Sequence, residues 1–196
     1  MITADAAPER VLAAAAGALR GGADVLQLRH KTLPRGELLA LAHRLRELAR
    51  DALFVVNDHV DIALLAGADG VHLGPDDLSL ASARRVAAGR LFIGASASTP
   101  ASARTAVAEG ADYLGAGAAF ATPIKSEKLV IGPAGVAAVA AAVGPAVPVF
   151  AIGGIEEGNV AQLVAEGLRR VCVIRAVSAA ADPEQAARRL RAMLDS

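Results

Sequence analysis

Short apolar runs rich in β-branched residues alternate along the chain with longer stretches in which Ala, Leu and Arg recur at helical spacing. The apolar runs predict strands at residues 2–3, 25–28, 53–56, 70–73, 91–93, 113–115, 147–152 and 171–174. The stretches between them predict helices at residues 9–20, 35–50, 62–66, 80–88, 101–109, 134–143, 160–166 and 183–194. Strands that are short and apolar on both faces are typical of a parallel sheet covered by helices. Strict alternation of eight such pairs predicts a (β/α)8 TIM barrel, here a compact single domain over residues 1–196.

A repeated tripeptide supports this alternation. The sequence Gly-Ala-Asp occurs at residues 22–24, 67–69 and 110–112, each time between a predicted helix and the next predicted strand. Gly is the residue expected where a helix ends in a left-handed turn. The first strand is the exception to the pattern, because only Met1 precedes Ile2, whereas a strand usually has about five residues. We therefore expect either a truncated first strand or a natural start upstream of Met1.

Composition and charge narrow the classes of protein that fit this pattern. The chain has 20 Lys+Arg against 20 Asp+Glu and no block of basic residues, which argues against a general nucleic-acid-binding protein. Its long apolar runs are interrupted by Gly and Pro, and no basic segment followed by an apolar stretch opens the chain, so we expect neither a membrane span nor a signal peptide. The single cysteine excludes an internal disulfide framework. These features predict a soluble, cytoplasmic protein. They leave the oligomeric state open, with a homodimer among the states allowed.

Polar residues follow most of the predicted strands. In a (β/α)8 barrel the carboxyl ends of the strands carry the active site, so these residues should meet at one rim. The set consists of Gln27, Arg29, Lys31, Asn57, Asp58, Asp76, Asp77, Ser96, Thr122, Lys125, Gly153, Gly154 and Arg175. A bare scaffold would not need cations, carboxylates, an amide and hydroxyls gathered at one rim, so the set predicts a functional site.

Asp58 and Asp77 follow neighbouring predicted strands and are placed to share a Mg²⁺ ion. This ion prefers oxygen ligands and is often held by one or two carboxylates together with substrate phosphates. Arg29, Lys31 and Lys125 would then face the same phosphates as fixed positive charges. The alternative is that each Asp is the N-cap of the helix that follows it, a position that Asp favours.

Gly153 and Gly154 stand between a predicted buried strand and a helix. Adjacent glycines expose backbone N–H groups and let a phosphate approach closely, and the loops after the seventh and eighth strands form the usual phosphate site of such barrels. A simple turn is the alternative.

The histidines predict no metal cluster. His72 and Cys172 lie in apolar strands and are expected in the core, and His30 is expected to point away from the pocket.

Taken in order, these motifs resemble the thiamine-phosphate synthase family. The resemblance covers nearly the whole chain and is carried by the segments VLQLRHK (25–31), VNDHVDIA (56–63), GADGVHLGPDDL (67–78), IGAS (93–96), ADYLG (111–115) and PVFAIGGI (148–155). It implies a Mg²⁺-dependent transferase that joins 4-amino-5-hydroxymethyl-2-methylpyrimidine diphosphate to hydroxyethylthiazole phosphate, giving thiamine phosphate and pyrophosphate. The mechanism implied is dissociative: pyrophosphate leaves first, and the thiazole nitrogen captures the pyrimidinylmethyl cation.

The resemblance also implies a role for each matching residue. The ligands of the pyrimidine diphosphate would be Gln27, Arg29, Lys31, Asn57 and Lys125, with Ser96 beside the pyrimidine. The ligands of the thiazole phosphate would be Thr122, Gly153, Ile174 and Arg175, and the Mg²⁺ ligands would be Asp58 and Asp77. Within this set the resemblance implies Arg29, Lys125 and Ser96 as catalytic residues.

Two residues depart from the family pattern on the thiazole side. Ile124 replaces the second Thr of the usual Thr-x-Thr-Lys loop, and Arg175 stands where the family often has Ser. We predict that the Arg175 guanidinium pairs with the thiazole phosphate; a surface arginine paired with a nearby carboxylate is the alternative.

Two other functions stay open at this stage. One is a thiazole tautomerase-like enzyme of the sister family, which carries a His where this chain has Ser98. The other is a non-catalytic paralogue that binds thiazole or thiamine phosphates as a regulator.

Overall fold

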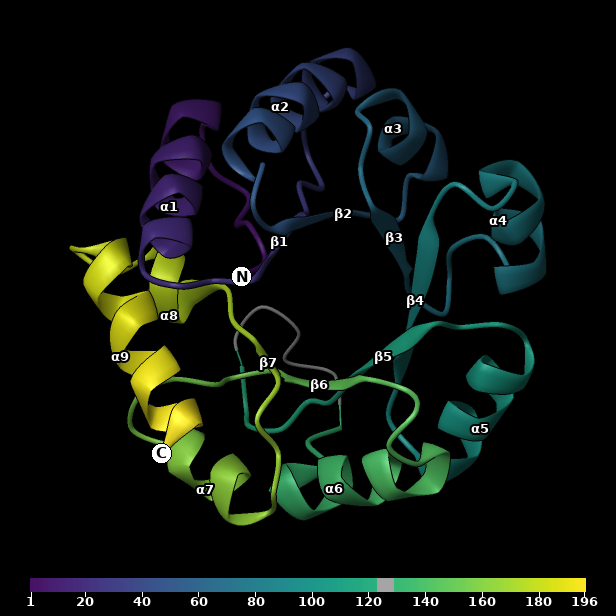
Figure 1. Cartoon of the computed structure of the whole chain (residues 1–196), viewed down its shortest axis with the longest axis vertical. Coiled ribbons are helices and arrows are strands. Elements are labelled where there is room, and N and C mark those ends of the chain that lie inside the picture. Colours follow the sequence, from purple (N-terminus) through teal and green to yellow (C-terminus); the bar gives the residue numbers. More distant parts are fainter. Residues whose placement is uncertain (123–128) are drawn as a thin grey trace.

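The computed structural model describes residues 1–122 and 129–196, which form one curled parallel sheet with its strands in sequence order. The strands are β1 (Val25–Leu28), β2 (Leu53–Asn57), β3 (Gly70–Leu73), β4 (Phe92–Ala97), β5 (Tyr113–Ala116), β6 (Val149–Ile152) and β7 (Val171–Cys172). The helices are α1 (Pro8–Arg20), α2 (Arg35–Leu48), α3 (Val60–Leu65), α4 (Leu80–Ala87), α5 (Pro100–Ala108), α6 (Gly132–Val143), α7 (Val160–Ala165), α8 (Arg175–Ser178) and α9 (Pro183–Asp195). Figure 1 shows the strands at the centre and the helices in a ring around them. The predicted barrel fold is confirmed.

The predicted first strand is reduced to a single bridge residue. Ile2 pairs with Gln27 of β1 in parallel, and its N–H donates to the Val173 carbonyl just after β7 over 2.9 Å. The Thr3 N–H donates to the Gln27 carbonyl at 2.9 Å, and the Gln27 N–H donates to the Met1 carbonyl at 2.8 Å. This segment thereby joins the two edges of the seven-stranded sheet. The truncated first strand is confirmed, and it closes the barrel.

The Gly-Ala-Asp repeat has a structural basis. Its glycines Gly22, Gly67 and Gly110 all have positive φ, of 93°, 63° and 100°, as expected where a helix ends in a left-handed turn. The Asp112 carboxylate accepts the Ile93 N–H at the start of β4 over 2.6 Å and pairs with a guanidinium of α4. The Asp69 carboxylate likewise accepts the N–H of Phe54, the first buried residue of β2, and pairs with the Arg46 guanidinium of α2. In these two repeats the aspartate therefore fastens its own strand to the preceding strand and to the helix that leads into that preceding strand, whereas Asp24 of the first repeat pairs with Arg191 of α9.

Two elements near the rim differ from the predicted ones. β4 extends to Ala97, so Ser96 lies inside a strand opposite Gly115 of β5 rather than in a loop. The small residues at this end of β4 hide its pattern, although they are needed: a Cβ on Gly94 would lie 2.0 Å from the Tyr113 ring. The second difference is α8, a short helix that begins at Arg175 directly after β7, where no helix was predicted.

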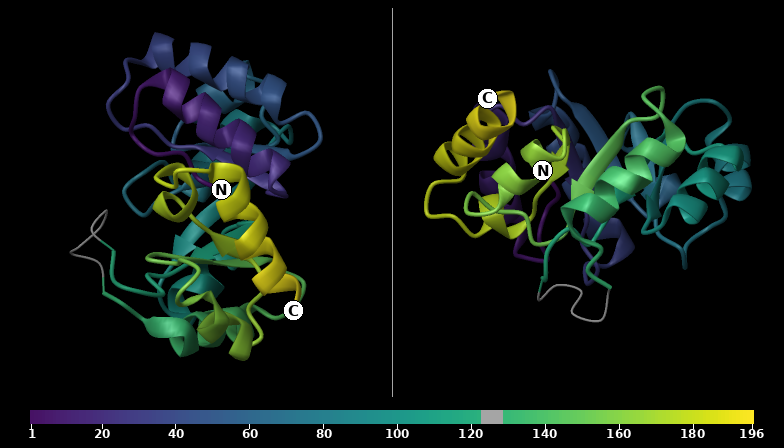
Figure 2. Two further views of the ribbon diagram at one scale, coloured as in Figure 1. Left: turned by 90° about the vertical axis from the view of Figure 1, so that its left-hand side faces the viewer. Right: turned by 90° about the horizontal axis from the view of Figure 1, so that it is seen from below.

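The apolar core lies between the sheet and the helices. Leu26 and Leu28 of β1 are buried in it, while Gln27 between them lines the pocket inside the barrel. On the outside, α9 packs against α1, as the side views show (Figure 2). None of the helices in the described part of the chain is long and apolar enough to cross a membrane.

Candidate active site

One pocket of about 820 Å³ opens at the carboxyl ends of the strands. The structure gathers around it nearly all of the residues that the sequence predicts for the site. Those lining it are Gln27, Arg29, Lys31, Asn57, Asp58, Asp77, Ser96, Thr122, Gly153, Ile174 and Arg175. Lys125 and Ile124 lie outside the described residues. The roles predicted for these residues stay predictions, because proximity to a pocket does not assign a ligand.

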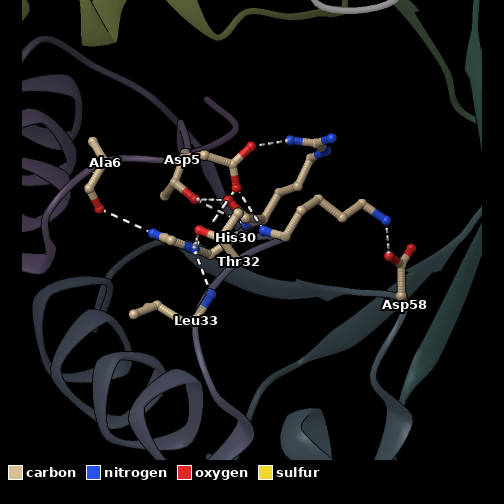
Figure 3. A network of polar contacts seen from close by, with 9 residues as sticks. Asp5, Ala6, His30, Thr32, Leu33 and Asp58 are labelled. Carbon is tan, nitrogen blue, oxygen red and sulfur yellow. Dashed lines mark hydrogen bonds and ion pairs between the residues drawn. The ribbon is translucent and has the colours of Figure 1, made fainter.

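Two cations lie on the loop that follows β1. The Arg29 guanidinium is 15% exposed and its Nη1 donates to Asp5 Oδ2 over 3.0 Å. The backbone N–H of Lys31 donates to the other oxygen of Asp5 at 2.5 Å, and the Lys31 ammonium donates to Asp58. Figure 3 shows Asp58 at one end of this network, on the side away from Ala6. Both cations are thus held by carboxylates and aimed at one part of the pocket wall.

Asp58 and Asp77 form a carboxyl pair next to these cations. Burial works to raise the pKa of Asp58, but hydrogen bonds with Asp77 and Lys31 outweigh it and leave that pKa below its usual value. Burial, followed by the hydrogen bond with Asp58, raises the pKa of Asp77. Like charges so close together cannot both ionise freely, so Asp77 is the carboxyl that keeps a proton more readily.

Neither of these aspartates caps a helix. The N-cap of α3 is His59, and the N-cap of α4 is Ser79, whose hydroxyl accepts the Ser82 N–H. Asp77 instead accepts the Gly74 N–H over 2.8 Å, and Asp58 has a left-handed backbone with φ of 66°. A non-glycine residue held in this conformation is uncommon, so the surrounding structure must compensate its cost. The capping alternative is therefore wrong for both residues.

His72 is a site residue that the sequence reasoning missed. It was expected in the core, but it is half-buried and lines the pocket. Its Nε2 is 3.1 Å from Ser96 Oγ, and its Nδ1 is 3.1 Å from the Tyr113 hydroxyl, whose pKa is raised by burial. Strand periodicity carried a signal: Val71 and Leu73 alternate with His72 and pack outward. Gly115 across the sheet leaves the space that the imidazole occupies, since a Cβ there would lie 3.2 Å from the ring.

A glycine loop and α8 form another part of the rim. Gly153 and Gly154 both have positive φ, of 101° and 64°, and a Cβ on Gly154 would lie 2.4 Å from a backbone carbonyl oxygen. The Asn159 side chain holds this loop at two points: its Nδ2 donates to the Gly154 carbonyl at 2.8 Å, and its Oδ1 accepts the Glu156 N–H at 2.9 Å. Asn159 was not predicted, since an Asn at the start of a helix reads as an ordinary cap.

Arg175 lies at the same rim and is exposed. Within the described part of the chain its side chain forms no hydrogen bond or ion pair, while its carbonyl accepts the Ala179 N–H at the end of α8. The alternative of a surface arginine paired with a nearby carboxylate therefore finds no partner among the described residues. A guanidinium in this position beside a glycine loop is available to bind an anion.

The other histidines and the cysteine add no metal ligands. The His30 Nε2 donates to the Ala6 carbonyl over 2.9 Å, and His30 does not line the pocket. His43 is exposed. Cys172 is not sealed in the core as expected: it lines the inner end of the pocket, and burial raises the pKa of its thiol. Among the described residues, no group of three or more His, Cys, Asp or Glu side chains could hold a metal ion. A metal here would rest on two carboxylates and on substrate oxygens.

A (β/α) barrel whose strand ends present paired cations, a carboxyl pair and a glycine loop belongs to the class of barrels built to bind phosphorylated small molecules. Comparison with known proteins narrows this class. The family model for thiamine monophosphate synthase matches residues 1–177, and the chain belongs to that family. The resemblance seen in the sequence is thereby confirmed, and with it the thiamine-phosphate synthase function and the transferase class of enzyme.

Individual relatives agree. The thiamine-phosphate synthase of Moorella thermoacetica is 48% identical over 178 residues, which are 89% of this chain and 84% of that protein. The thiamine-phosphate synthase of Gloeobacter violaceus is 48% identical over 168 residues; the match covers 85% of this chain but about half, 49%, of that protein. The solved thiamine phosphate pyrophosphorylase of Pyrococcus furiosus superposes with a TM-score of 0.88 at 39% identity, covering 99% of this chain and 93% of that one.

Proposed function

We propose that this chain couples 4-amino-5-hydroxymethyl-2-methylpyrimidine diphosphate with hydroxyethylthiazole phosphate, releasing thiamine phosphate and pyrophosphate. The observation that carries the proposal is that Arg29 and Lys31 line one pocket together with the carboxyl pair Asp58 and Asp77, and that the Lys31 ammonium contacts Asp58. A diphosphate needs several fixed cations, and a phosphate ester needs a second anion subsite, which the glycine loop and Arg175 supply.

The residue roles follow from this division. Gln27, Arg29, Lys31, Asn57 and Lys125 bind the pyrimidine diphosphate, and Ser96 lies beside the pyrimidine. Thr122, Gly153, Ile174 and Arg175 bind the thiazole phosphate. The proposal for Lys125 rests on the sequence motif alone. His72 joins the set, since its hydrogen bond to Ser96 orients that hydroxyl.

The donors present fit a Mg²⁺ ion held by Asp58 and Asp77. Carboxylate oxygens suit this ion, and two protein ligands leave positions for substrate phosphate oxygens and water. The hydrogen bond between the two carboxyls indicates that their oxygens converge, and no other structural role, such as capping, accounts for both. When bound, the ion would neutralise charge on the diphosphate.

The chain's own residues suit a dissociative substitution. The bond from the pyrimidine methylene carbon to the diphosphate oxygen breaks with both electrons on the oxygen, and the thiazole nitrogen then supplies the pair for the new carbon–nitrogen bond. Arg29 and Lys31 stabilise the negative charge on the departing pyrophosphate. No protein nucleophile is needed, and the pocket holds the second substrate close to the cation as it forms.

A turnover assay tests the proposal and separates it from the alternatives. With both substrates and Mg²⁺, we expect thiamine phosphate and pyrophosphate in equal amounts. Isomerisation of the thiazole without pyrophosphate release would favour the tautomerase-like enzyme. Binding of thiazole phosphate without turnover would favour the non-catalytic paralogue.

Small molecules are the only partners that this proposal requires. We infer a cytoplasmic location and no nucleic-acid or membrane partner, in keeping with the balanced charge of the chain. The homodimer allowed by the sequence is a separate proposal, which sedimentation equilibrium over a range of protein concentrations tests.

A further inference from the structure

Asp5 contacts both of the cationic residues on the loop after β1 without reaching the pocket. Its Oδ2 accepts the Arg29 Nη1 at 3.0 Å, and its Oδ1 accepts the Lys31 backbone N–H at 2.5 Å. Asp5 is not among the residues that line the pocket. Asp5 Oδ1 also lies 3.7 Å from His30 Nδ1, but His30 does not line the pocket either. Any influence that Asp5 has on a substrate must therefore pass through the residues that it contacts.

The same N-terminal segment also holds the Arg29 backbone. The buried Thr3 hydroxyl donates to the Arg29 carbonyl at 2.8 Å and accepts the Arg29 N–H at 2.9 Å. Thr3 therefore fixes the main chain at residue 29, and Asp5 fixes the direction in which its side chain leaves. The tightness of this arrangement is visible in Figure 3, where Asp5 lies in the middle of the network.

The ion pair leaves most of the guanidinium available. Within the described part of the chain, Asp5 is the one side-chain partner of the Arg29 guanidinium, and it takes only Nη1. The Nε and Nη2 donors can still face an anion in the pocket, in the forked geometry that suits a phosphate. The carboxylate also balances a positive charge that would otherwise lie close to the Lys31 ammonium.

We propose that Asp5 is a positioning residue for the diphosphate subsite, holding Arg29 and the Lys31 main chain in the geometry that binds pyrophosphate oxygens. This rests on the proposed function, because it takes Arg29 as a diphosphate ligand. Two effects oppose each other on the removal of Asp5: the loss of a competing negative charge, and the loss of an ordered cation. The Arg29 side chain is only 15% exposed, so the loss of its fixed position outweighs the loss of the competing negative charge. We therefore expect weaker binding of the diphosphate in the absence of Asp5.

A double-mutant cycle on Asp5 and Arg29 tests the proposal. The readout is the Kd of Mg²⁺–pyrophosphate by calorimetry, together with the KM of each substrate. Asp5→Ala should raise the Kd of pyrophosphate and the KM of the pyrimidine diphosphate about ten-fold, a coupling within the range for residues in one ion-pair network. The KM of the thiazole phosphate should stay the same. In an Arg29→Ala background, Asp5→Ala should raise the Kd by clearly less than ten-fold, because only its hold on the Lys31 main chain is then lost.

Glu9→Ala is the matched control. Glu9 forms an ion pair with Arg44 at 2.7 Å on the surface of the same N-terminal region, away from the pocket, so its loss should change neither KM. Asp5→Asn keeps the shape of the side chain and an acceptor for the Lys31 N–H, and it should show the same coupling to Arg29 if the alanine variant does not fold.

Several outcomes would overturn the proposal. These are pyrophosphate binding that is unchanged or tighter in Asp5→Ala, and an equal effect of Asp5→Ala with and without Arg29. Equal losses for both substrates would indicate a merely structural role and would overturn it too. Wild-type protein that neither binds pyrophosphate nor forms product would overturn the proposed function and this inference with it. A fully active wild type with an unaffected Asp5→Ala variant would overturn this inference alone.

Discussion

At the scale of single residues, the proposed anion subsites depend on individual side chains at the rim, and Arg175 is the one whose role is most directly testable. Its guanidinium has no protein partner among the described residues, and it lies beside the glycine loop. We predict that Arg175→Ala raises the KM of the thiazole phosphate by about ten- to a hundred-fold, the value of one charge-assisted hydrogen bond of roughly 1.5–3 kcal/mol. The KM of the pyrimidine diphosphate should stay nearly unchanged. Steady-state kinetics with each substrate varied in turn would measure both, and an unaltered thiazole KM would return Arg175 to the role of a surface residue.

The carboxyl pair gives a second prediction at this scale. Asp58→Asn or Asp77→Asn should lower turnover about a hundred-fold or more while the protein stays folded, because each removes a charged oxygen donor for Mg²⁺. Asp61→Asn, which removes only an exposed ion-pair partner on α3, is the control. Near wild-type rates at limiting Mg²⁺ in either site variant would contradict the shared ion. Circular dichroism of each variant would establish that the fold is intact.

The raised pKa of Asp77 adds a pH dependence to the same pair. A proton and a metal ion compete for the Asp77 oxygens, and burial beside Asp58 makes the proton bind more readily than at an ordinary carboxyl. We therefore predict that the Kd of Mg²⁺ rises as the pH falls toward this raised pKa, and that the rise begins at a higher pH than for an isolated aspartate. Calorimetric titrations with Mg²⁺ at several pH values would measure it. A Kd that stays constant over that range would argue against Asp77 as a ligand.

At the scale of elements, the contribution of the Gly-Ala-Asp repeat to the free energy of unfolding can be measured. The Asp112 carboxylate joins the start of β4 to a guanidinium of α4, so Asp112→Asn should lower the free energy of unfolding by about 1–2 kcal/mol. The side chain is 42% exposed, which keeps the ion-pair part of this value small. Chemical denaturation would measure the loss against Asp51→Asn, an exposed aspartate in a turn. Equal midpoints for the two variants would show that the repeat does not stabilise the fold.

Elements with a strong apolar pattern could be predicted from the sequence, and those with small residues could not. The alternation of β1 through β3 with their helices was clear because Val, Leu and Phe mark each buried strand. The end of β4 was missed because Gly94, Ala95 and Ser96 carry no such pattern, although Gly94 has to be small to fit beside the Tyr113 ring. α8 was missed because four residues are too few to show helical spacing.

The candidate site divides in the same way. Its charged residues were predictable, because each follows an apolar strand and so belongs at the rim. His72 was not, because a polar residue within a strand has the same local sequence whether it faces a core or a pocket. Asp5 and Asn159 act on other residues, and their contacts depend on distances between loops that no spacing along the chain reveals.

For the whole molecule, the barrel is a ring in which six pairs of neighbouring strands share a ladder and one junction, between β7 and β1, is narrow. Between β7 and β1 the ring is closed by the backbone bonds of Ile2 and its two neighbours, backed by the packing of α1 on α9. Every other neighbouring pair of strands shares a ladder of at least two residue pairs. Local opening therefore costs least at this junction.

The segment that closes the barrel lies two residues from Asp5, whose carboxylate holds Arg29. Binding of a diphosphate at Arg29 and local opening of the barrel therefore involve the same N-terminal segment. A ligand that binds only the closed segment withdraws the open form from the population, by an amount set by its concentration relative to its Kd. The amides of Ile2, Thr3 and Gln27 should then exchange with deuterium more slowly as Mg²⁺–pyrophosphate is added, while those of β3 and β4 should change little. If pyrophosphate does not change the exchange rates of these amides, diphosphate binding and the opening of the barrel are not coupled. With coupling, thermodynamic linkage requires the reverse effect as well: a substitution that populates the open form of the closing strand must weaken diphosphate binding in proportion to the closed fraction that it removes, although it touches no ligand.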